Sequence, residues 1–206
     1  MNRAKLATEP EMSATTMISG RDGRGLRNLG SAGTPPYERE WRTVERKSRC
    51  PRLRRRRRWA SQFSKVRSWV FIDGVDEVTR FFQESDDIAE AIQRVNTDAD
   101  VVWVDGHSDY GHAFEVFWDK WGKDVGPKTT VLLLGDARNN YHASQAWVVK
   151  EMRHKARHVY WLNPEPHGYW DTGDSIVSEY GLYCDGVYEC RNLRQLERFV
   201  STIVEG

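Results

Sequence analysis

The feature that most constrains the fold is a short apolar run followed directly by a polar loop, within residues 129–140. The run is Val-Leu-Leu-Leu at residues 131–134, and Gly135 and Asp136 end it. An uninterrupted apolar run of this length is typical of a strand buried on both faces, as in a parallel sheet. Ligands of open α/β sheets bind beyond the carboxyl ends of the strands, which makes Asp136 a candidate site residue. The alternative is that Asp136 only caps the helix that follows.

Strands and helices alternate along the chain from residue 59 onward. Apolar runs predict strands at residues 69–72, 78–82, 131–134, 158–162 and 186–189. Amphipathic spacing predicts helices at about residues 86–96, 112–120, 144–157 and 193–204. In the first of these helices, Ile88, Ile92 and Val95 are expected on the buried side. This alternation predicts an α/β fold with a mainly parallel sheet.

Residues 1–58 show neither a strand period nor a helix period, and we expect a disordered segment there. Lys and Arg outnumber Asp and Glu by 17 to 6 in residues 1–66, whereas the balance is 14 to 24 in residues 67–206. The densest basic run consists of Arg54, Arg55, Arg56, Arg57 and Arg58. Such a run could bind nucleic acid phosphates, or it could be a solvated tail. The acidic remainder of the chain argues against a broad nucleic acid surface.

Membrane and disulfide signals are both lacking in the sequence. No apolar run approaches the ~20 residues that a membrane-spanning helix needs, and the N-terminus has no apolar signal-peptide core. The three cysteines, Cys50, Cys184 and Cys190, form no Cys-x-x-Cys pair. An odd number of cysteines without pairing motifs is typical of reduced thiols. We therefore expect a cytoplasmic protein that does not bind membranes.

Two loops carry residues that could bind a metal ion. Ser108 lies between two glycines at a predicted helix start, and Asp136 follows the apolar run. Ser108 could be a helix N-cap only, but a hydroxyl and a carboxylate could also bind Mg²⁺ or Mn²⁺, which prefer oxygen ligands. Asp73 follows another predicted strand and could belong to the same surface.

These stretches carry a family resemblance over residues 59–204. The sequence resembles the C-terminal part of a CoxE-like von Willebrand factor A (VWA) domain protein. The matching stretches are residues 70–79 (Val-Phe-Ile-Asp-Gly-Val-Asp-Glu-Val-Thr), 105–111 (Asp-Gly-His-Ser-Asp-Tyr-Gly), 133–141 (Leu-Leu-Gly-Asp-Ala-Arg-Asn-Asn-Tyr), 161–166 (Trp-Leu-Asn-Pro-Glu-Pro) and 189–198 (Glu-Cys-Arg-Asn-Leu-Arg-Gln-Leu-Glu-Arg).

The resemblance implies a doubly wound α/β fold with a metal-ion-dependent adhesion site at one edge of the sheet. It also implies an adaptor, not an enzyme. Such proteins act beside a MoxR-type AAA+ ATPase and a client protein, in maturation of a metalloenzyme such as a carbon monoxide dehydrogenase. Ser108 and Asp136 match ligands of the second and third metal motifs, and Asp73 and Asn139 would be further contacts to a partner.

The sequence departs from the family pattern at the first metal motif. The family has Asp-x-Ser-x-Ser after its first, central strand, but no Asp-x-Ser occurs in this chain. We therefore expect a VWA domain at residues 59–206 that lacks this strand, is truncated, and binds Mg²⁺ or Mn²⁺ weakly or not at all. We interpret residues 1–58 as an out-of-frame or mis-started segment; a purpose-built basic arm is the alternative.

The sequence also allows one enzymatic alternative. Asp73, Asp105 and Asp136 could serve a metal-dependent hydrolase or phosphotransferase on an α/β fold. The sequence lacks an Asp-x-Asp nucleophile motif after the first predicted strand, because residues 73–76 read Asp-Gly-Val-Asp.

Overall fold

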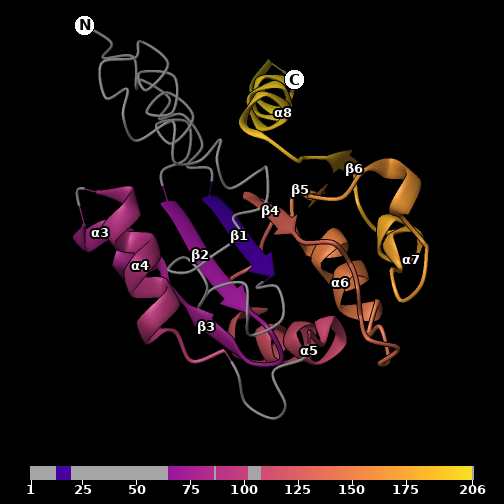
Figure 1. Cartoon of the computed structure of the whole chain (residues 1–206), viewed down its shortest axis with the longest axis horizontal. Helices are drawn as coiled ribbons and strands as arrows, with labels where there is room; N and C mark the ends of the chain where they lie inside the picture. The colour runs from indigo at the N-terminus through magenta and orange to yellow at the C-terminus, as the bar shows by residue number, and fades with distance from the viewer. Residues whose placement is uncertain (1–12, 20–64, 86, 102–107, 206) are drawn as a thin grey trace, which may run out of the picture.

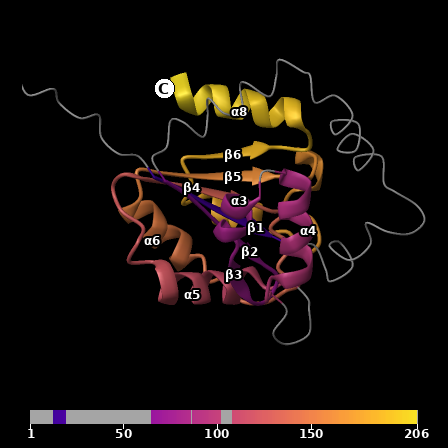
Figure 2. The same cartoon turned by 90° about the vertical axis from the view of Figure 1, so that its left-hand side faces the viewer.

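The computed structural model describes residues 13–19, 65–85, 87–101 and 108–205. In these residues helices pack on both faces of a six-stranded sheet (Figures 1 and 2). In chain order the elements are β1 (Ser13–Ser19), β2 (Lys65–Phe71), β3 (Val75–Glu77), α3 (Thr79–Glu84), α4 (Ile88–Asp98), α5 (Tyr110–Trp121), β4 (Thr129–Leu134), α6 (Trp147–Lys155), β5 (His158–Asn163), η1 (His167–Tyr169), α7 (Val177–Gly181), β6 (Gly186–Glu189) and α8 (Leu193–Glu205).

The strands follow the order β3-β2-β1-β4-β5-β6. All neighbouring strands are parallel except β2 and β3, which are antiparallel. The predicted α/β fold with a mainly parallel sheet is therefore confirmed. Strand β4 is buried along most of its length, as its apolar run predicts.

The expectation that the central strand is missing is wrong. Strand β1 lies between β2 and β4, where Ser13 pairs with both Lys65 and Thr129. The segment has no strong apolar pattern, but it hydrogen-bonds to a neighbour on each side, which satisfies the backbone groups that β2 and β4 would otherwise expose. The expected disorder of residues 1–12 and 20–58 lies outside the described residues.

One predicted strand is a helix. Residues 78–82 were expected to form a strand, but Thr79–Glu84 is helix α3, and the short strand β3 precedes it. Phe81 is buried and Phe82 is exposed, so this pair does not form one continuous apolar face.

The second difference is Ile92 of α4, which is 43% exposed although it was expected to be buried, whereas Val95 is buried as predicted. The side chain of Ile88 lies outside the described part.

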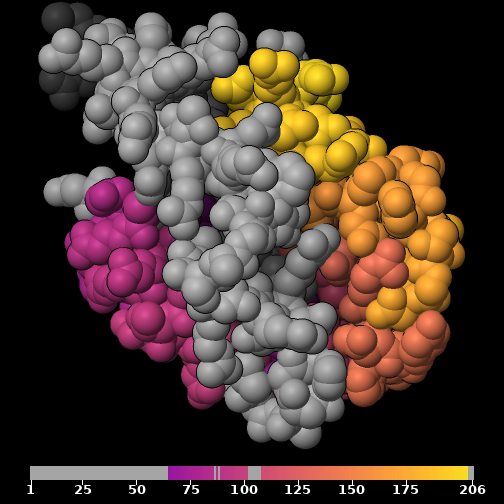
Figure 3. Space-filling model, viewed as in Figure 1, coloured from indigo at the N-terminus to yellow at the C-terminus, as the bar shows by residue number. Residues whose placement is uncertain are grey.

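Different helices cover the two faces of the sheet. Helices α5, α6 and α7 bury a large cluster rich in aromatic rings, which includes Trp69 and Trp161. On the other face, α3 and α4 pack on β2, and α8 packs on β4 and β5. In the space-filling view α3 and α4 (magenta) and α8 (yellow) lie on opposite sides of this second face (Figure 3). Within the described part of the chain, no helix has the length and apolar character to cross a membrane.

Candidate partner-binding site at the carboxyl edge of the sheet

Loops from several strands meet where the parallel strands end. We call residues 72–74, 108–109, 135–146 and 164–176 the edge loops. The backbone N–H of Asp109 donates to the carbonyl of Ile72 at 3.1 Å, which joins the loop after β2 to the start of α5. Asp73 is 4% exposed, so it lies beneath the surface of these loops. The sequence therefore predicts correctly that the loops with Asp73, Ser108 and Asp136 lie together.

Asp136 is held by its neighbours in the edge loops. Its Oδ1 accepts hydrogen bonds from the hydroxyl of Tyr110, at 3.0 Å, and from the backbone N–H of Arg138, at 3.1 Å. The next helix, α6, begins only at Trp147, so Asp136 is not a helix cap. Ser108 is not the N-cap of α5 either, because Asp109 has that role and accepts from the N–H of His112. Both capping alternatives are therefore excluded.

Asn139 and Asn140 connect the loop after β4 to the start of α5. The Oδ1 of Asn139 accepts from the N–H of Tyr110 at 2.8 Å, and its Nδ2 donates to the carbonyl of His142 at 2.7 Å. The Nδ2 of Asn140 donates to the carbonyl of Ser108 at 2.8 Å. Asn139 is 1% exposed, so in this structure it acts as a cross-link beneath the surface. Its expected contact with a partner stays a prediction.

Arg138 joins two of the edge loops, the one after β4 and the one between β5 and α7. Its Nε and Nη2 donate to the two carboxylate oxygens of Glu165, each at 2.9 Å, and its Nη1 donates to Asp174 at 2.9 Å. These two carboxylates, Glu165 foremost, raise the pKa of the Arg138 guanidinium above its ordinary high value. Because the paired geometry fixes both partners, the guanidinium orients the loop after β4 relative to both ends of the loop between β5 and α7.

The loop after β4 has an unusual backbone. Ala137, Asn140, Tyr141 and Gln145 have φ values of 57°, 47°, 61° and 48°. Residues other than glycine rarely adopt this left-handed region, and they keep it only where surrounding contacts require it. Tyr141 is 84% exposed, so the loop presents a large aromatic side chain to solvent.

The described ligand candidates do not by themselves fit a divalent cation. Ser108 is 6% exposed, and Asp136 already accepts two hydrogen bonds on one oxygen. In the described ranges no group of three or more His, Cys, Asp or Glu residues could hold a metal ion. One carboxylate and one hydroxyl are too few ligands for Mg²⁺, which demands a near-octahedral shell.

Sequence reasoning missed the residues that organise this edge. Arg138 and Glu165 lie inside two of the matching stretches, but nothing in their spacing shows that they pair. A charged residue placed between Asp136 and Asn139 was the available signal. Two sets of expected residues lie outside the described part: the basic run at residues 54–58 and Asp105 of the hydrolase alternative.

Comparison with known proteins agrees with this geometry. A family model described as VWA domain containing CoxE-like protein matches residues 42–199, more than half of the chain. The match begins before the domain boundary expected at residue 59, which stays a prediction. A search of curated proteins gave no significant match.

Three solved structures with a similar fold illustrate the likeness. Proximal thread matrix protein 1 from the mussel byssus has 14% identity and a TM-score of 0.51, with 94% of this chain and 44% of that chain covered. A von Willebrand factor type A protein from Catenulispora acidiphila has 10% identity, a TM-score of 0.52 and coverages of 93% and 42%. The conserved hypothetical protein BatB from Bacteroides thetaiotaomicron has 12% identity, a TM-score of 0.50 and coverages of 94% and 97%.

The chain spans less than half of the mussel and Catenulispora chains that it matches. A further structure of the mussel protein is described as having a zinc-occupied MIDAS motif, which concerns that protein. Identities this low establish the fold alone. The family match, the strand order and the loops at the carboxyl edge agree with one another, and the chain belongs to the family of VWA domain containing CoxE-like proteins.

Proposed function

We propose that this protein is an adaptor that binds a partner protein through the edge loops and catalyses no reaction itself. The observation that carries the proposal is the cross-linking of the edge loops: Asn139, Asn140 and Arg138 connect loops from separate strands. A surface held in this way is pre-organised, so partner binding costs less conformational entropy. The exposed Tyr141 on this surface is the type of residue enriched in protein interfaces.

The partner we propose is a MoxR-type AAA+ ATPase together with its client protein. The family match supports this choice, because the resemblance to CoxE-like proteins implies action beside such an ATPase. The client would be a metalloenzyme under maturation, such as a carbon monoxide dehydrogenase, in the cytoplasm. We further propose that this chain binds Mg²⁺ or Mn²⁺ weakly or not at all, because its described ligands are too few.

A pull-down with a purified MoxR-type ATPase and ATP tests the proposal. The full chain should retain the ATPase, and Tyr141→Ala should weaken the retention because it removes an exposed aromatic contact. Leu182→Ala is the matched control: Leu182 is 77% exposed but lies between α7 and β6, where the chain enters the opposite edge of the sheet. The control should bind like the unaltered chain.

Three outcomes would overturn this proposal. Equal loss of binding in Tyr141→Ala and Leu182→Ala would show that the edge loops have no special role. Recovery of RNA or DNA that depends on Arg54 to Arg58 and weakens with salt would favour the nucleic acid alternative. Phosphatase activity that Asp136→Asn abolishes would favour the hydrolase alternative.

A further inference from the structure

We infer that Arg138 is a built-in cation that holds the edge loops in their binding arrangement without a divalent metal ion. The inference rests on the proposed function only in treating these loops as the binding surface. It concerns how that surface is formed, and it can be tested on the isolated chain.

The contacts of Arg138 have the form expected of an organising cation. Its guanidinium uses Nε and Nη2 for Glu165 and Nη1 for both Asp174 and the carbonyl of Thr172, at 2.9–3.1 Å. The side chains of Glu165 and Asp174 are only 14% and 19% exposed. Two carboxylates with little access to water need a counter-charge, and one planar guanidinium serves both.

The two acidic partners extend this arrangement into the backbone. Asp174 accepts from the N–H of Asn140 through its Oδ2, and its carbonyl accepts from the N–H of Asn139. The N–H of Glu165 donates to the Oδ1 of Asn163, and the Nδ2 of Asn163 donates to the carbonyl of Asp136 at 3.3 Å. The network thus returns to the loop from which Arg138 projects. It closes around the loops after β4 and β5.

The consequence reaches the start of α5. Asn139 and Asn140, whose backbone N–H groups bond to Asp174, also hold Tyr110 and Ser108 through their side chains. Displacing Asp174 therefore loosens the link between β4 and α5. Arg138 thereby positions Ser108 and Asp136 relative to each other: its backbone N–H donates to the Oδ1 of Asp136, and Ser108 is linked to the same loop through Asn140.

Hydrogen exchange of backbone amides, measured by NMR on the full chain, tests the inference. The reporters are the amides of Asn139, Asn140 and Glu165, and the variants are Arg138→Ala and Arg138→Lys. We expect about tenfold faster exchange at these amides in Arg138→Ala, because local opening becomes easier without the charge-assisted bonds. Arg138→Lys should restore only part of the protection, since an ammonium cannot bind two carboxylates in the same plane.

Arg153→Ala is the matched control, because Arg153 forms a similarly short ion pair with Asp185, at 2.8 Å, away from the edge loops. It should leave the three reporter amides unchanged. Added methylguanidinium should slow the exchange of Arg138→Ala towards that of the unaltered chain, because it replaces the missing group. A purely structural loss would not respond in this way.

The role of metal is tested on the unaltered chain in excess Mg²⁺ and in excess EDTA. Equal exchange at the three reporter amides in both conditions supports the inference. Protection that appears only with Mg²⁺ would overturn it, as would unchanged exchange in Arg138→Ala. If Arg138→Ala does not fold, the same exchange measurement is made on Arg138→Lys and Glu165→Gln. The inference is overturned if both variants protect the three reporter amides as well as the unaltered chain does.

These results do not depend on any partner protein. A failed pull-down with intact reporter protection would reject the proposed function and leave the role of Arg138 standing. Unchanged amide exchange in Arg138→Ala, together with normal retention of the ATPase, would reject the role of Arg138 and leave the proposed function standing.

Discussion

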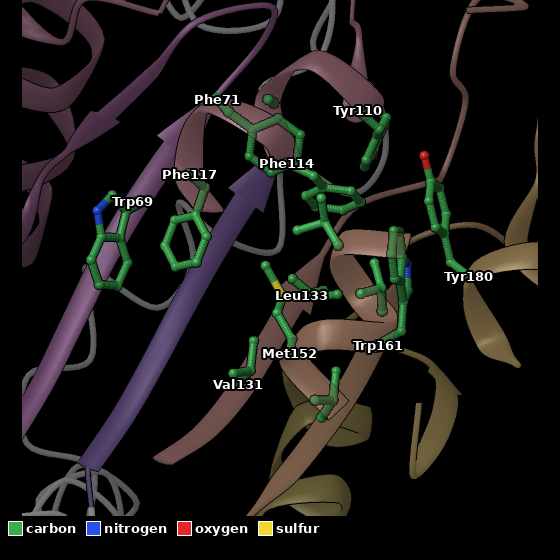
Figure 4. Close-up of a cluster of buried hydrophobic side chains, with 14 of the residues drawn as sticks. Trp69, Phe71, Tyr110, Phe114, Phe117, Val131, Leu133, Met152, Trp161 and Tyr180 are labelled. Atoms are coloured by element: carbon green, nitrogen blue, oxygen red, sulfur yellow. The ribbon is translucent and has the colours of Figure 1, made fainter. Parts of the chain in front are cut away.

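The aromatic cluster under α5, α6 and α7 and the edge loops are two adjoining regions that are stabilised in different ways. In the cluster, rings pack against one another: Trp161 stacks on Tyr180 with centroids 5.0 Å apart, and Phe71 meets the edge of Tyr110 at 5.1 Å (Figure 4). In the edge loops, single polar atoms of Asn139 and Arg138 join segments that are far apart in the sequence.

This difference predicts different responses to substitution. Apolar burial is shared among many contacts and scales with the volume removed. A hydrogen bond to a buried group depends on one atom, and its loss leaves the other group unsatisfied. Tyr110 belongs to both regions, since its ring packs in the cluster and its hydroxyl bonds to Asp136.

Trp161→Ala should have the largest effect on stability. Trp161 is 1% exposed, stacks on Tyr180, and donates from Nε1 to the carbonyl of Gly135. We expect a loss of about 3–5 kcal/mol in the free energy of unfolding, measured with urea. Trp147→Ala is the control, and it should cost less than ~1 kcal/mol because Trp147 is 46% exposed. Similar losses in both variants would contradict the importance of the cluster.

Asn139→Ala should have the second largest effect. The substitution removes the acceptor of the Tyr110 N–H, in buried surroundings, and the donor to the His142 carbonyl, which is part-buried. The expected loss is about 2 kcal/mol in the same urea experiment. Asn140→Gly is the milder comparison, because it removes only the bond to the Ser108 carbonyl and glycine suits the φ of 47° at that position. A loss in Asn139→Ala no larger than in Asn140→Gly would count against the cross-link.

Tyr110→Phe separates the contribution of the aromatic ring, which packs in the cluster, from that of the hydroxyl, which bonds in the edge loops. The ring contacts with Phe71 and Phe114 remain, whereas the hydroxyl bonds to Asp136 and to the Ala137 N–H disappear. We expect a loss of about 1 kcal/mol in the free energy of unfolding, together with faster amide exchange at Ala137. If thermal unfolding instead showed a loss as large as that of Trp161→Ala, the ring would not be the main contribution of Tyr110.

The smallest effect concerns an ion pair outside both regions. Arg67 donates to both carboxylate oxygens of Glu77, and this bonding lowers the pKa of Glu77 below its ordinary 4.5. Because the folded pKa is the lower one, the contribution is fully present above about pH 4.5 and is lost as the pH falls through the folded value. We expect less than ~1 kcal/mol, since the pair is partly exposed.

The measurement is the difference in unfolding free energy between the unaltered chain and Glu77→Gln at pH 6 and at pH 3. The difference should shrink at the lower pH. A difference that grows as the pH falls would show that the sign of the pKa shift is wrong. Glu77→Gln should not alter amide exchange in the edge loops.

Local sequence patterns predicted the elements that carry their own signal. The apolar run of β4 and the amphipathic spacing of α6 are properties of consecutive residues, and both elements lie where they were expected. The segment after Val78 was predicted wrongly because a single buried residue, Phe81, is compatible with a helix as well as with a strand. The position of Asp136 followed from the end of a predicted strand, whereas Ser108 was placed at a predicted helix start and joined to Asp136 as a possible second metal ligand.

What the sequence by itself determined is the α/β class, the family resemblance and the place of Asp136 at a strand end. Tertiary structure alone decided that Ser13–Ser19 is the central strand, because a polar segment becomes a strand here through bonds to β2 and β4. It also decided the role of Arg138, whose partners lie 27 and 36 residues further along the chain. Contacts at such separations depend on how the loops meet in space, and no local pattern encodes them.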